Sequence, residues 1–416
     1  MTEYRVNRLE TTKMMGPMVD RYWEKLRRAH DDGLNTAWTV GPLFMIPMAA
    51  GCRTHFHAGY ASYTGGRRAA PEMLEVAERE GHPIETCSYI KLHAGYVAME
   101  QRGLPIREQF RLPRPDVIFV GRYCPEQSHL AEILHRQTGV PVITVDLTPC
   151  QTDEDLPGHV AYVERMIREE AIPALESLLG RPFDYDKLSE IVVHLKRCAE
   201  LRDECLEIAK HKPSPWTIVD MCVSIAPVMY MMGEPGTIEY YEALRAELQE
   251  RVNQNVSAIL PEEKYRLYYD CYIMWGWLGD LSRKIASYGG NMVAGRYPFM
   301  MFPEPQYLDP ADPVHSIAEE LVHWMLSQAT PVFGLRKITQ WVQEYDIDGM
   351  VMLCPPGCRL FMAQPDIIDA VERQCGIPGV LLEMDMIDPK YYNEAQLDTR
   401  LQALFEMIEA RRRLRG

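Results

Sequence analysis

The stretch "PDVIFVGRYCPEQSHLAEILHRQTGVPVITVDL", residues 115–147, has the pattern of a β-α-β unit. Its apolar runs, "VIFV" and "VPVITV", do not alternate with polar residues, and they indicate strands buried on both faces. The polar stretch between them, which begins at Pro125, has the spacing of a helix. Two strands joined through a helix lie in a parallel sheet with a right-handed crossover. The unit therefore predicts an α/β fold.

The rest of the chain extends this pattern. Residues 3–32 indicate a helical arm, and residues 158–255 are helical throughout. Strand-like runs return near residue 265 and alternate with helices to the end of the chain. We expect two Rossmann-like parallel-sheet domains with an intervening helical segment, and we place the boundaries at residues 1–157, 158–260 and 261–416.

Composition and charge exclude several classes of protein. The 416 residues are 47% hydrophobic and 25% charged, as in ordinary soluble proteins. We expect a cytoplasmic protein, because there is neither a signal-peptide pattern nor an apolar run of about 18 residues that would span a membrane. The net charge of −15 argues against nucleic acid and anionic membranes as partners. The basic C-terminal "EARRRLRG" is either an RNA-binding tail or, as we favour, a charged last helical turn.

Several cysteines lie where an α/β sheet binds ligands. In a reducing compartment, the 11 cysteines are core residues, catalytic thiols or metal ligands rather than disulfides. Cys124, Cys150 and Cys358 follow predicted buried strands, at the carboxyl edge where ligands bind. Cys87 precedes the predicted helix "SYIKLHAGYVAMEQ", whose dipole would stabilise a thiolate.

Thiolates on loops of two domains could converge in the cleft between them and bind an iron–sulfur cluster or zinc. No C-x₂-C pair supports a zinc ribbon, and ordinary buried cysteines stay an open alternative. Cys52 and Cys354 are ambiguous, and either Cys354 or Cys358 could face the cleft. Core positions are predicted for the remaining cysteines, Cys198, Cys205, Cys222, Cys271 and Cys375.

Other catalytic motifs are absent from the sequence. There is no P-loop, no G-x-G-x-x-G after a strand and no H-E-x-x-H. In "RTHFHAGY", His55 and His57 are two residues apart and would face the same way on a strand. We consider a general base or a substrate hydrogen bond from His57, a mononuclear metal site, or ordinary core or surface histidines.

Residues 10–412 resemble the 2-hydroxyacyl-CoA dehydratase and benzoyl-CoA reductase family. "CSYIKLHAGY" is similar to the family's first cysteine motif, and "VGRYCPEQ" is similar to its second. The likeness continues in "YYDCYIMWGWLGDLSRKIASYGGNMVAGRY", "DGMVMLCPPGCRLFMAQPDIIDA" and "GIPGVLLEMDMIDPKYYNEAQLDTRLQALFEMI". The order and spacing of these motifs are more specific than any one of them.

The resemblance implies a cofactor. Cys87, Cys124 and Cys358 would bind a [4Fe–4S] cluster in the cleft between the two α/β domains. The fourth iron would be left for substrate, water or another ligand that is not cysteine. Some relatives hold a double-cubane [8Fe–9S] cluster, for which Cys150 and Cys354 are extra candidates.

The resemblance also implies an activity and partners. A separate ATP-dependent iron–sulfur activator would supply a low-potential electron, and a related second subunit would complete a heterodimer. In the dehydratases, a 2-hydroxyacyl-CoA becomes a ketyl radical, loses hydroxide and a β-proton, and gives an enoyl-CoA. The alternatives are reduction of an aryl-CoA ring, a double-cubane reductase of small molecules, and a non-catalytic electron-relay subunit.

The sequence departs from the family at one position of the site. Many members carry an acidic residue near "HFHAGY", where this chain has none. His57 is therefore the candidate base. Arg53, Arg67 and Arg68 are candidates for the CoA phosphates, and surface arginines are the alternative explanation.

Overall fold

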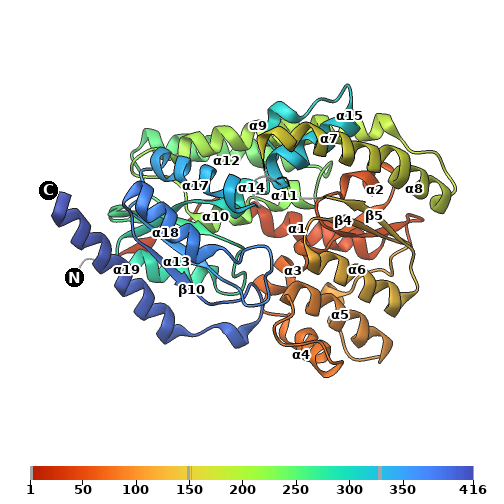
Figure 1. Ribbon diagram of the computed structural model, residues 1–416, viewed down its shortest axis with the longest axis horizontal. Coiled ribbons are helices and arrows are strands. Elements are labelled where there is room, and N and C mark those ends of the chain that lie inside the picture. The colour runs from red at the N-terminus through yellow and green to blue at the C-terminus, as the bar shows by residue number, and fades with distance from the viewer. Residues whose placement is uncertain (1–2, 148–149, 151, 327–329, 416) are drawn as a thin grey trace.

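The computed structural model describes residues 3–147, 150, 152–326 and 330–415. It contains two α/β lobes, the first at the right of Figure 1 and the second, coloured from green-teal to blue, at the left. The first lobe is built on a parallel sheet with the strand order β3-β2-β4-β5. Its strands are β2 (Thr36–Val40), β3 (Arg53–Phe56), β4 (Val117–Arg122) and β5 (Val142–Asp146).

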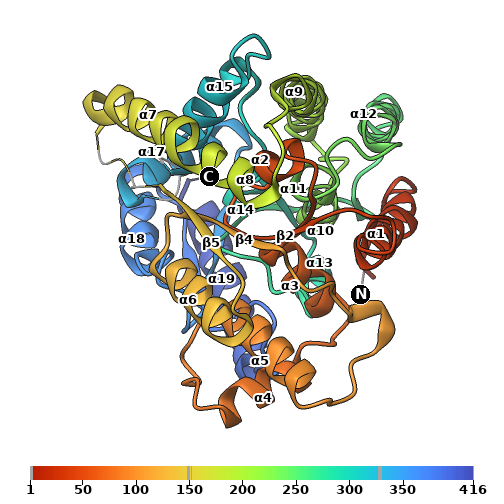
Figure 2. The ribbon, with the colours of Figure 1, turned by 90° about the vertical axis from the view of Figure 1, so that its right-hand side faces the viewer.

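Helices cover both faces of the first sheet. Figure 2 shows α5 and α6 below it and α7 and α8 above it. Both faces of the sheet are therefore removed from water, which explains the unbroken apolar runs of its strands. The helices from the N-terminus to the end of this lobe are α1 (Thr12–Arg27), α2 (Met45–Ala49), α3 (His57–Gly66), α4 (Pro71–Arg79), α5 (Ser88–Gln101) and α6 (Pro125–Thr138).

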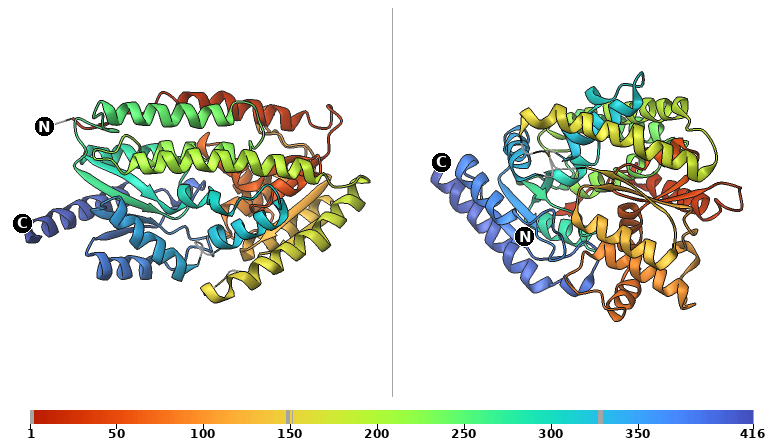
Figure 3. Two further views of the ribbon diagram at one scale, coloured as in Figure 1. Left: turned by 90° about the horizontal axis from the view of Figure 1, so that it is seen from above. Right: turned by 45° about the vertical axis from the view of Figure 1, so that its right-hand side comes forward.

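A helical segment connects the lobes. Its longest helices, α9 and α12, pack side by side along one face of the molecule (Figure 3). Helix α9 also contacts α2 of the first lobe and α15 of the second, so it bridges the two. The helices are α7 (Leu156–Arg165), a π-helical turn (Met166–Ala171), α8 (Ile172–Leu179), α9 (Tyr185–Ala209), α10 (Ile218–Val223), α11 (Ala226–Met229) and α12 (Thr237–Asn253).

The second lobe repeats the topology of the first. Its parallel strands are β7 (Tyr265–Asp270), β8 (Gly290–Gly295), β9 (Gly349–Leu353) and β10 (Gly379–Leu382), in the order β8-β7-β9-β10. Its helices are α13 (Leu278–Ser287), α14 (Arg296–Met300), α15 (Pro313–Glu320), α17 (Pro331–Glu344), α18 (Gln364–Cys375) and α19 (Glu394–Arg415), and a π-helical turn (Leu321–Leu326) follows α15. A short antiparallel pair, β1 (Arg5–Val6) with β6 (Ile259–Leu260), ties the N-terminus to this lobe.

The predicted α/β class with two parallel sheets and helical segments is confirmed. The domain boundaries at residues 157 and 260 stay a prediction. No helix within the described ranges has both the length and the apolar character needed to cross a membrane.

In each lobe the first strand lies between the second and the third strands. The chain therefore adds the second strand on one side of the first and then crosses over to add the third on the other side. Ligands bind in α/β sheets at the carboxyl side of such a switch point. In the first lobe, Gly41 follows β2 with φ +92°, and a Cβ there would lie 2.2 Å from the carbonyl oxygen of Gly121. Glycine therefore allows the ends of β2 and β4 to meet at this point.

Candidate functional site

Cys87, Cys124 and Cys358 come together from the two lobes. Cys124 follows β4 and begins α6, Cys87 begins α5, and Cys358 lies in the loop after β9. The thiols of Cys87 and Cys124 both interact electrostatically with that of Cys358. A Cβ on Gly357 would lie 2.9 Å from the Cα of Cys87. The glycine therefore lets the Cys358 loop pack directly against the start of α5.

Backbone N–H groups lie near each of these three sulfurs and can donate hydrogen bonds to its thiolate. At Cys87 and Cys124 the donors belong to the first turn of a helix, where such groups lack partners within the helix. Hydrogen bonds of this kind stabilise thiolates and tune the potential of a bound cluster. The donors are Tyr89 and Ile90 for Cys87, Glu126 and Gln127 for Cys124, and Leu360 and Phe361 for Cys358.

Burial determines the ionisation of two of these thiols. It raises the pKa of Cys87 well above its usual value and that of Cys124 to about 11. The pKa of Cys358 is lowered instead, chiefly by a hydrogen bond from Cys271. Three thiols that lie close to one another, with Cys358 buried and Cys87 and Cys124 half-buried, require positive charge in order to ionise together, and a bound metal supplies it.

Cys271 is a fourth thiol at this site, which reasoning from the sequence missed. It is buried, as predicted, but it directly follows β7 and contacts Cys358 instead of belonging to the core of an element. Its φ of +79° is unusual for a residue with a side chain. The apolar pattern predicts a strand that continues through Cys271 to residue 275. If the sequence had indicated that the strand ends at Asp270, Cys271 would have been predicted to lie at the carboxyl edge of its sheet, like the cysteines that follow β4 and β9.

The other cysteines take different positions. Cys354 lies one residue beyond β9, is half-buried and interacts electrostatically with Cys358. Cys150 follows the outermost strand β5, and its thiol donates to the carbonyl oxygen of Thr152 over 3.0 Å. Within the described ranges, no interaction joins Cys150 to Cys358. Cys52 precedes β3 and therefore lies at the opposite edge of the sheet. Cys198, Cys205, Cys222 and Cys375 lie in helices and pack in or against the core, as predicted.

Two buried ion pairs hold these loops in place. Lys91 on α5 pairs with Asp388, beyond β10, over 3.1 Å, and both side chains are only 1% exposed. This pair fastens the helix that begins at Cys87 to the second lobe. Asp270, next to Cys271, pairs with Arg296 through two contacts of 2.8 Å and also accepts a hydrogen bond from Gln364. That pair fixes the end of β7 against the starts of α14 and α18.

His57 begins α3 directly after β3 and is buried. Its Nδ1 accepts the backbone N–H of Gly41 over 3.3 Å, which leaves the ring proton on Nε2. Burial and the neighbouring His93 lower its pKa to about 3. This geometry favours a neutral imidazole that donates a hydrogen bond. The role of His57 as a base stays a prediction. His55 and His93 lie within hydrogen-bonding distance, 3.4 Å, deeper in the same lobe.

The chemistry of the donor set fits a cluster better than a single ion. In the described part of the chain, no three His, Cys, Asp or Glu side chains are grouped closely enough for one metal ion. The cysteines that bind a cubane each bind a different iron, so they stand farther apart than the ligands of one ion. Three thiols that approach one another from two lobes are ligands of the type that such a cluster takes.

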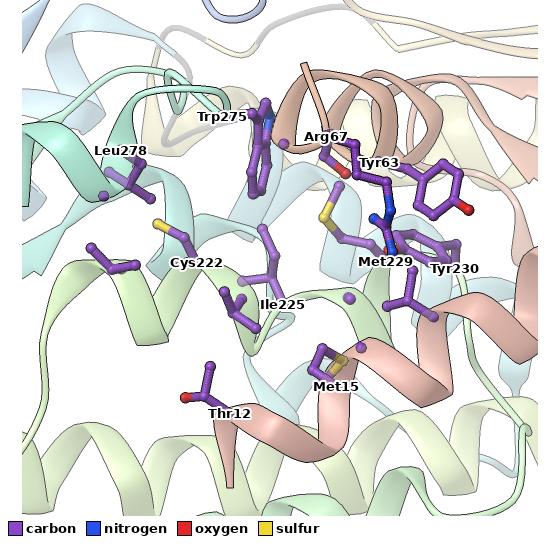
Figure 4. Close-up of a pocket in the computed structure, with 18 of the residues that line it drawn as sticks. Thr12, Met15, Tyr63, Arg67, Cys222, Ile225, Met229, Tyr230, Trp275 and Leu278 are labelled. Carbon is purple, nitrogen blue, oxygen red and sulfur yellow. The ribbon is translucent and has the colours of Figure 1, made fainter. Parts of the chain in front are cut away.

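A cavity of about 410 Å³ lies between α1, α3, α10, α11 and α13. Figure 4 shows its mainly apolar walls, with Met15, Ile225, Met229 and Leu278 among the labelled side chains. Arg67 also lines it and lies 4.0 Å from the centre of the Tyr63 ring.

Of the arginines predicted to bind CoA phosphates, Arg67 alone lines this cavity. Arg53 pairs with Glu234 over 2.7 Å, at a different cavity. Arg68 pairs with Asp280 over 2.9 Å.

The fold and the site define a class: an α/β protein whose two parallel-sheet lobes bring cysteines together at their carboxyl edges. A sequence model described as "2-hydroxyglutaryl-CoA dehydratase, D-component" matches residues 46–408. The chain belongs to this family, which comprises 2-hydroxyacyl-CoA dehydratase and benzoyl-CoA reductase subunits.

Three characterised relatives cover most of the chain. It is 27% identical to one of the subunits of benzoyl-CoA reductase from Thauera aromatica, over 85% of this chain and 83% of the relative. It is 26% identical to lactoyl-CoA dehydratase subunit alpha of Anaerotignum propionicum, over 92% of this chain and 93% of the relative. It is 25% identical to the (R)-2-hydroxyisocaproyl-CoA dehydratase alpha subunit of Clostridioides difficile, over 85% of each.

Proposed function

We propose that this chain is the iron–sulfur subunit of an enzyme that removes water from a 2-hydroxyacyl-CoA to give an enoyl-CoA. The observation that carries the proposal is the convergence of Cys87, Cys124 and Cys358 from two lobes in a member of this family. The names of the relatives from Anaerotignum propionicum and Clostridioides difficile support a dehydratase.

Cys87, Cys124 and Cys358 would hold a [4Fe–4S] cluster. When bound, it supplies one-electron transfer and an iron that can act as a Lewis acid on a substrate oxygen. The backbone N–H groups around the three sulfurs stabilise their thiolates, and the Lys91–Asp388 pair keeps Cys87 in register with Cys358. The Nε2–H of His57 is available to orient a substrate oxygen. Of the two extra candidates for a double-cubane cluster, Cys354 is the one that interacts electrostatically with Cys358, and we rank this cluster below the single cubane.

The relatives from Thauera aromatica, Anaerotignum propionicum and Clostridioides difficile are each named as one subunit of an enzyme. We extend this to the present chain and propose a related second subunit. We also propose that an ATP-dependent iron–sulfur activator delivers the electron.

Reduction of an aryl-CoA ring is the second candidate. The 27% identity to the benzoyl-CoA reductase of Thauera aromatica favours it. The aromatic rings of Tyr63, Tyr230 and Trp275 in the cavity wall also suit a planar aryl group.

The test is turnover by the anaerobically purified chain, combined with its second subunit and a reduced activator. Candidate substrates are lactoyl-CoA, 2-hydroxyisocaproyl-CoA, phenyllactyl-CoA and benzoyl-CoA, and mass spectrometry distinguishes loss of water from gain of two hydrogens. We expect loss of water from a 2-hydroxyacyl-CoA, and no turnover by Cys358→Ser. Reduction of benzoyl-CoA alone would select the second candidate. If the wild-type complex holds its cluster and turns over none of them, both candidates are wrong.

A further inference from the structure

Arg202, on α9, carries a positive charge inside the protein. Its side chain is 0% exposed. The guanidinium carbon lies 4.6 Å from the centre of the Trp216 ring and 4.8 Å from that of Phe302. Its Nη2 donates to the carbonyl oxygen of Pro298, on α14, over 3.4 Å. The charge therefore lies between the helical segment and the second lobe, where an uncompensated charge is costly.

The protein supplies little negative charge near this guanidinium. No carboxylate within the described ranges forms an ion pair with Arg202. The groups that act on it electrostatically are, from the strongest to the weakest, Cys205, Tyr241, Tyr345 and Asp203. Burial raises the pKa of Cys205 to about 12 and also raises the pKa values of the two tyrosines, so all three are neutral. Asp203, the carboxylate, contributes least.

The hydrogen-bond donors around this charge also lack acceptors. Among the described residues, Nε and Nη1 of Arg202 and Nε1 of Trp216 have no hydrogen-bond partner. All three atoms can only donate. The faces of the Trp216 and Phe302 rings attract a cation, but they are weak acceptors for its N–H groups. The missing partner is therefore an acceptor, and the buried charge favours one that is negative.

We propose that a small inorganic anion, chloride in the first instance, binds here, accepts hydrogen bonds from Arg202 and Trp216, and joins α9 to the second lobe. A buried water molecule would supply an acceptor but would leave the charge uncompensated. The guanidinium already packs against two rings, so the expected ligands are the monoatomic halides. The inference is independent of the proposed function, because it involves none of the cysteines of the candidate site.

The first test measures the unfolding temperature of the anaerobically purified chain as sodium chloride replaces sodium gluconate. Gluconate is too large for such a site, and constant ionic strength keeps the screening of surface charges equal. We expect the unfolding temperature to rise with chloride and then to increase only with the logarithm of its concentration, because the ion binds the folded state alone. An unfolding temperature that does not respond to chloride would contradict the proposal.

Variants test whether the response belongs to this site. Arg202→Met removes the charge and its donors, so it should lose the response to chloride and, in gluconate, be at least as stable as the wild type. Trp216→Phe keeps a ring and removes one donor, and we expect its Kd for chloride to rise about three- to tenfold. Arg197→Met is the matched control, because Arg197 lies on the same helix, is 40% exposed and should leave the response unchanged.

A response to chloride in Arg202→Met equal to that of the wild type would overturn the proposal. If Arg202→Met does not fold, an unchanged Kd in Trp216→Phe would overturn it instead.

The second test locates the ion. Bromide scatters anomalously, so crystals grown in sodium bromide should show an anomalous peak within hydrogen-bonding distance of Nε or Nη1 of Arg202. A position there that scatters without an anomalous signal is a water molecule, and it would contradict the proposal. A bromide peak without a response of the unfolding temperature to chloride would mean an adventitious ion only, which also contradicts it.

Discussion

Single residues at the site show where ordinary preferences are overridden. Cys271 has the left-handed backbone that glycine adopts most readily, and its thiol contacts Cys358. For a residue with a side chain this conformation costs roughly 1–2 kcal/mol. The surrounding structure, including the Asp270–Arg296 pair one residue away, holds it in place.

The backbone cost at Cys271 can be measured with two variants that both lose the thiol. Cys271→Gly removes the unfavourable conformation and Cys271→Ala keeps it, so we expect the glycine variant to be more stable by about 1 kcal/mol. Urea unfolding of the metal-free proteins would measure the difference. An alanine variant as stable as the glycine variant would show that the position is not strained.

Glu320 at the end of α15 predicts a pH dependence of stability. It is 3% exposed, and burial raises its pKa to about 8, with a contribution from Glu304. The protonated carboxyl is therefore favoured in the folded protein. The stability that this contributes is fully present below pH about 4.3, the pKa of a glutamate in an unfolded chain, and the free energy of unfolding falls as the pH rises from there through 8.

We expect Glu320→Gln, which stays neutral, to raise the unfolding temperature clearly at pH 8 and only slightly at pH 5. Scanning calorimetry at both pH values would measure the gap. Glu319→Gln, at the partly exposed neighbour, is the control. An unfolding temperature that rises equally at both pH values would contradict the assignment.

At the scale of elements, apolar pattern predicted most of the secondary structure. The strands β4 and β5 were evident in the sequence because burial on both faces leaves an unbroken apolar run. The strand β3 was not, since "RTHF" is short and mostly polar and owes its place to pairing with β2. The end of β7 was missed for a related reason: "CYIMW" continues the apolar run beyond Asp270, where tertiary contacts end the strand.

We predict that breaking the contact between α5 and the second lobe reduces retention of the proposed cluster. Lys91→Met leaves the Asp388 carboxylate buried without its main partner, at a cost of about 3–5 kcal/mol. We expect a lower unfolding temperature and less iron per chain after desalting, because Cys87 loses its register with Cys358.

Asp388→Asn in the same chain removes the uncompensated charge and keeps the acceptor for the Lys390 N–H. The double variant should therefore recover most of the lost stability. A double variant as unstable as Lys91→Met would show that the helix contact, and not the charge, carries the effect.

At the scale of the whole molecule, the two lobes share one strand order, and the site depends on how they face each other. The local pattern of the sequence predicted that Cys124 and Cys358 follow buried strands and that Cys87 precedes a helix. It did not predict which of these segments pack against one another. Their convergence depends on contacts between segments far apart in the chain, such as Gly357 against Cys87 and Lys91 with Asp388. Neither composition nor periodicity encodes such contacts. The cavity beside α1 was missed for the same reason.

The most direct test of the central claim is the iron and acid-labile sulfide content per chain of anaerobically purified protein, with an EPR spectrum after reduction by dithionite. We predict about four irons and about four sulfides per chain in the wild type. We also predict a marked loss of both in Cys87→Ser, Cys124→Ser and Cys358→Ser. Protein kept free of oxygen that contains no iron, or that keeps its full iron in all three variants, would contradict the claim.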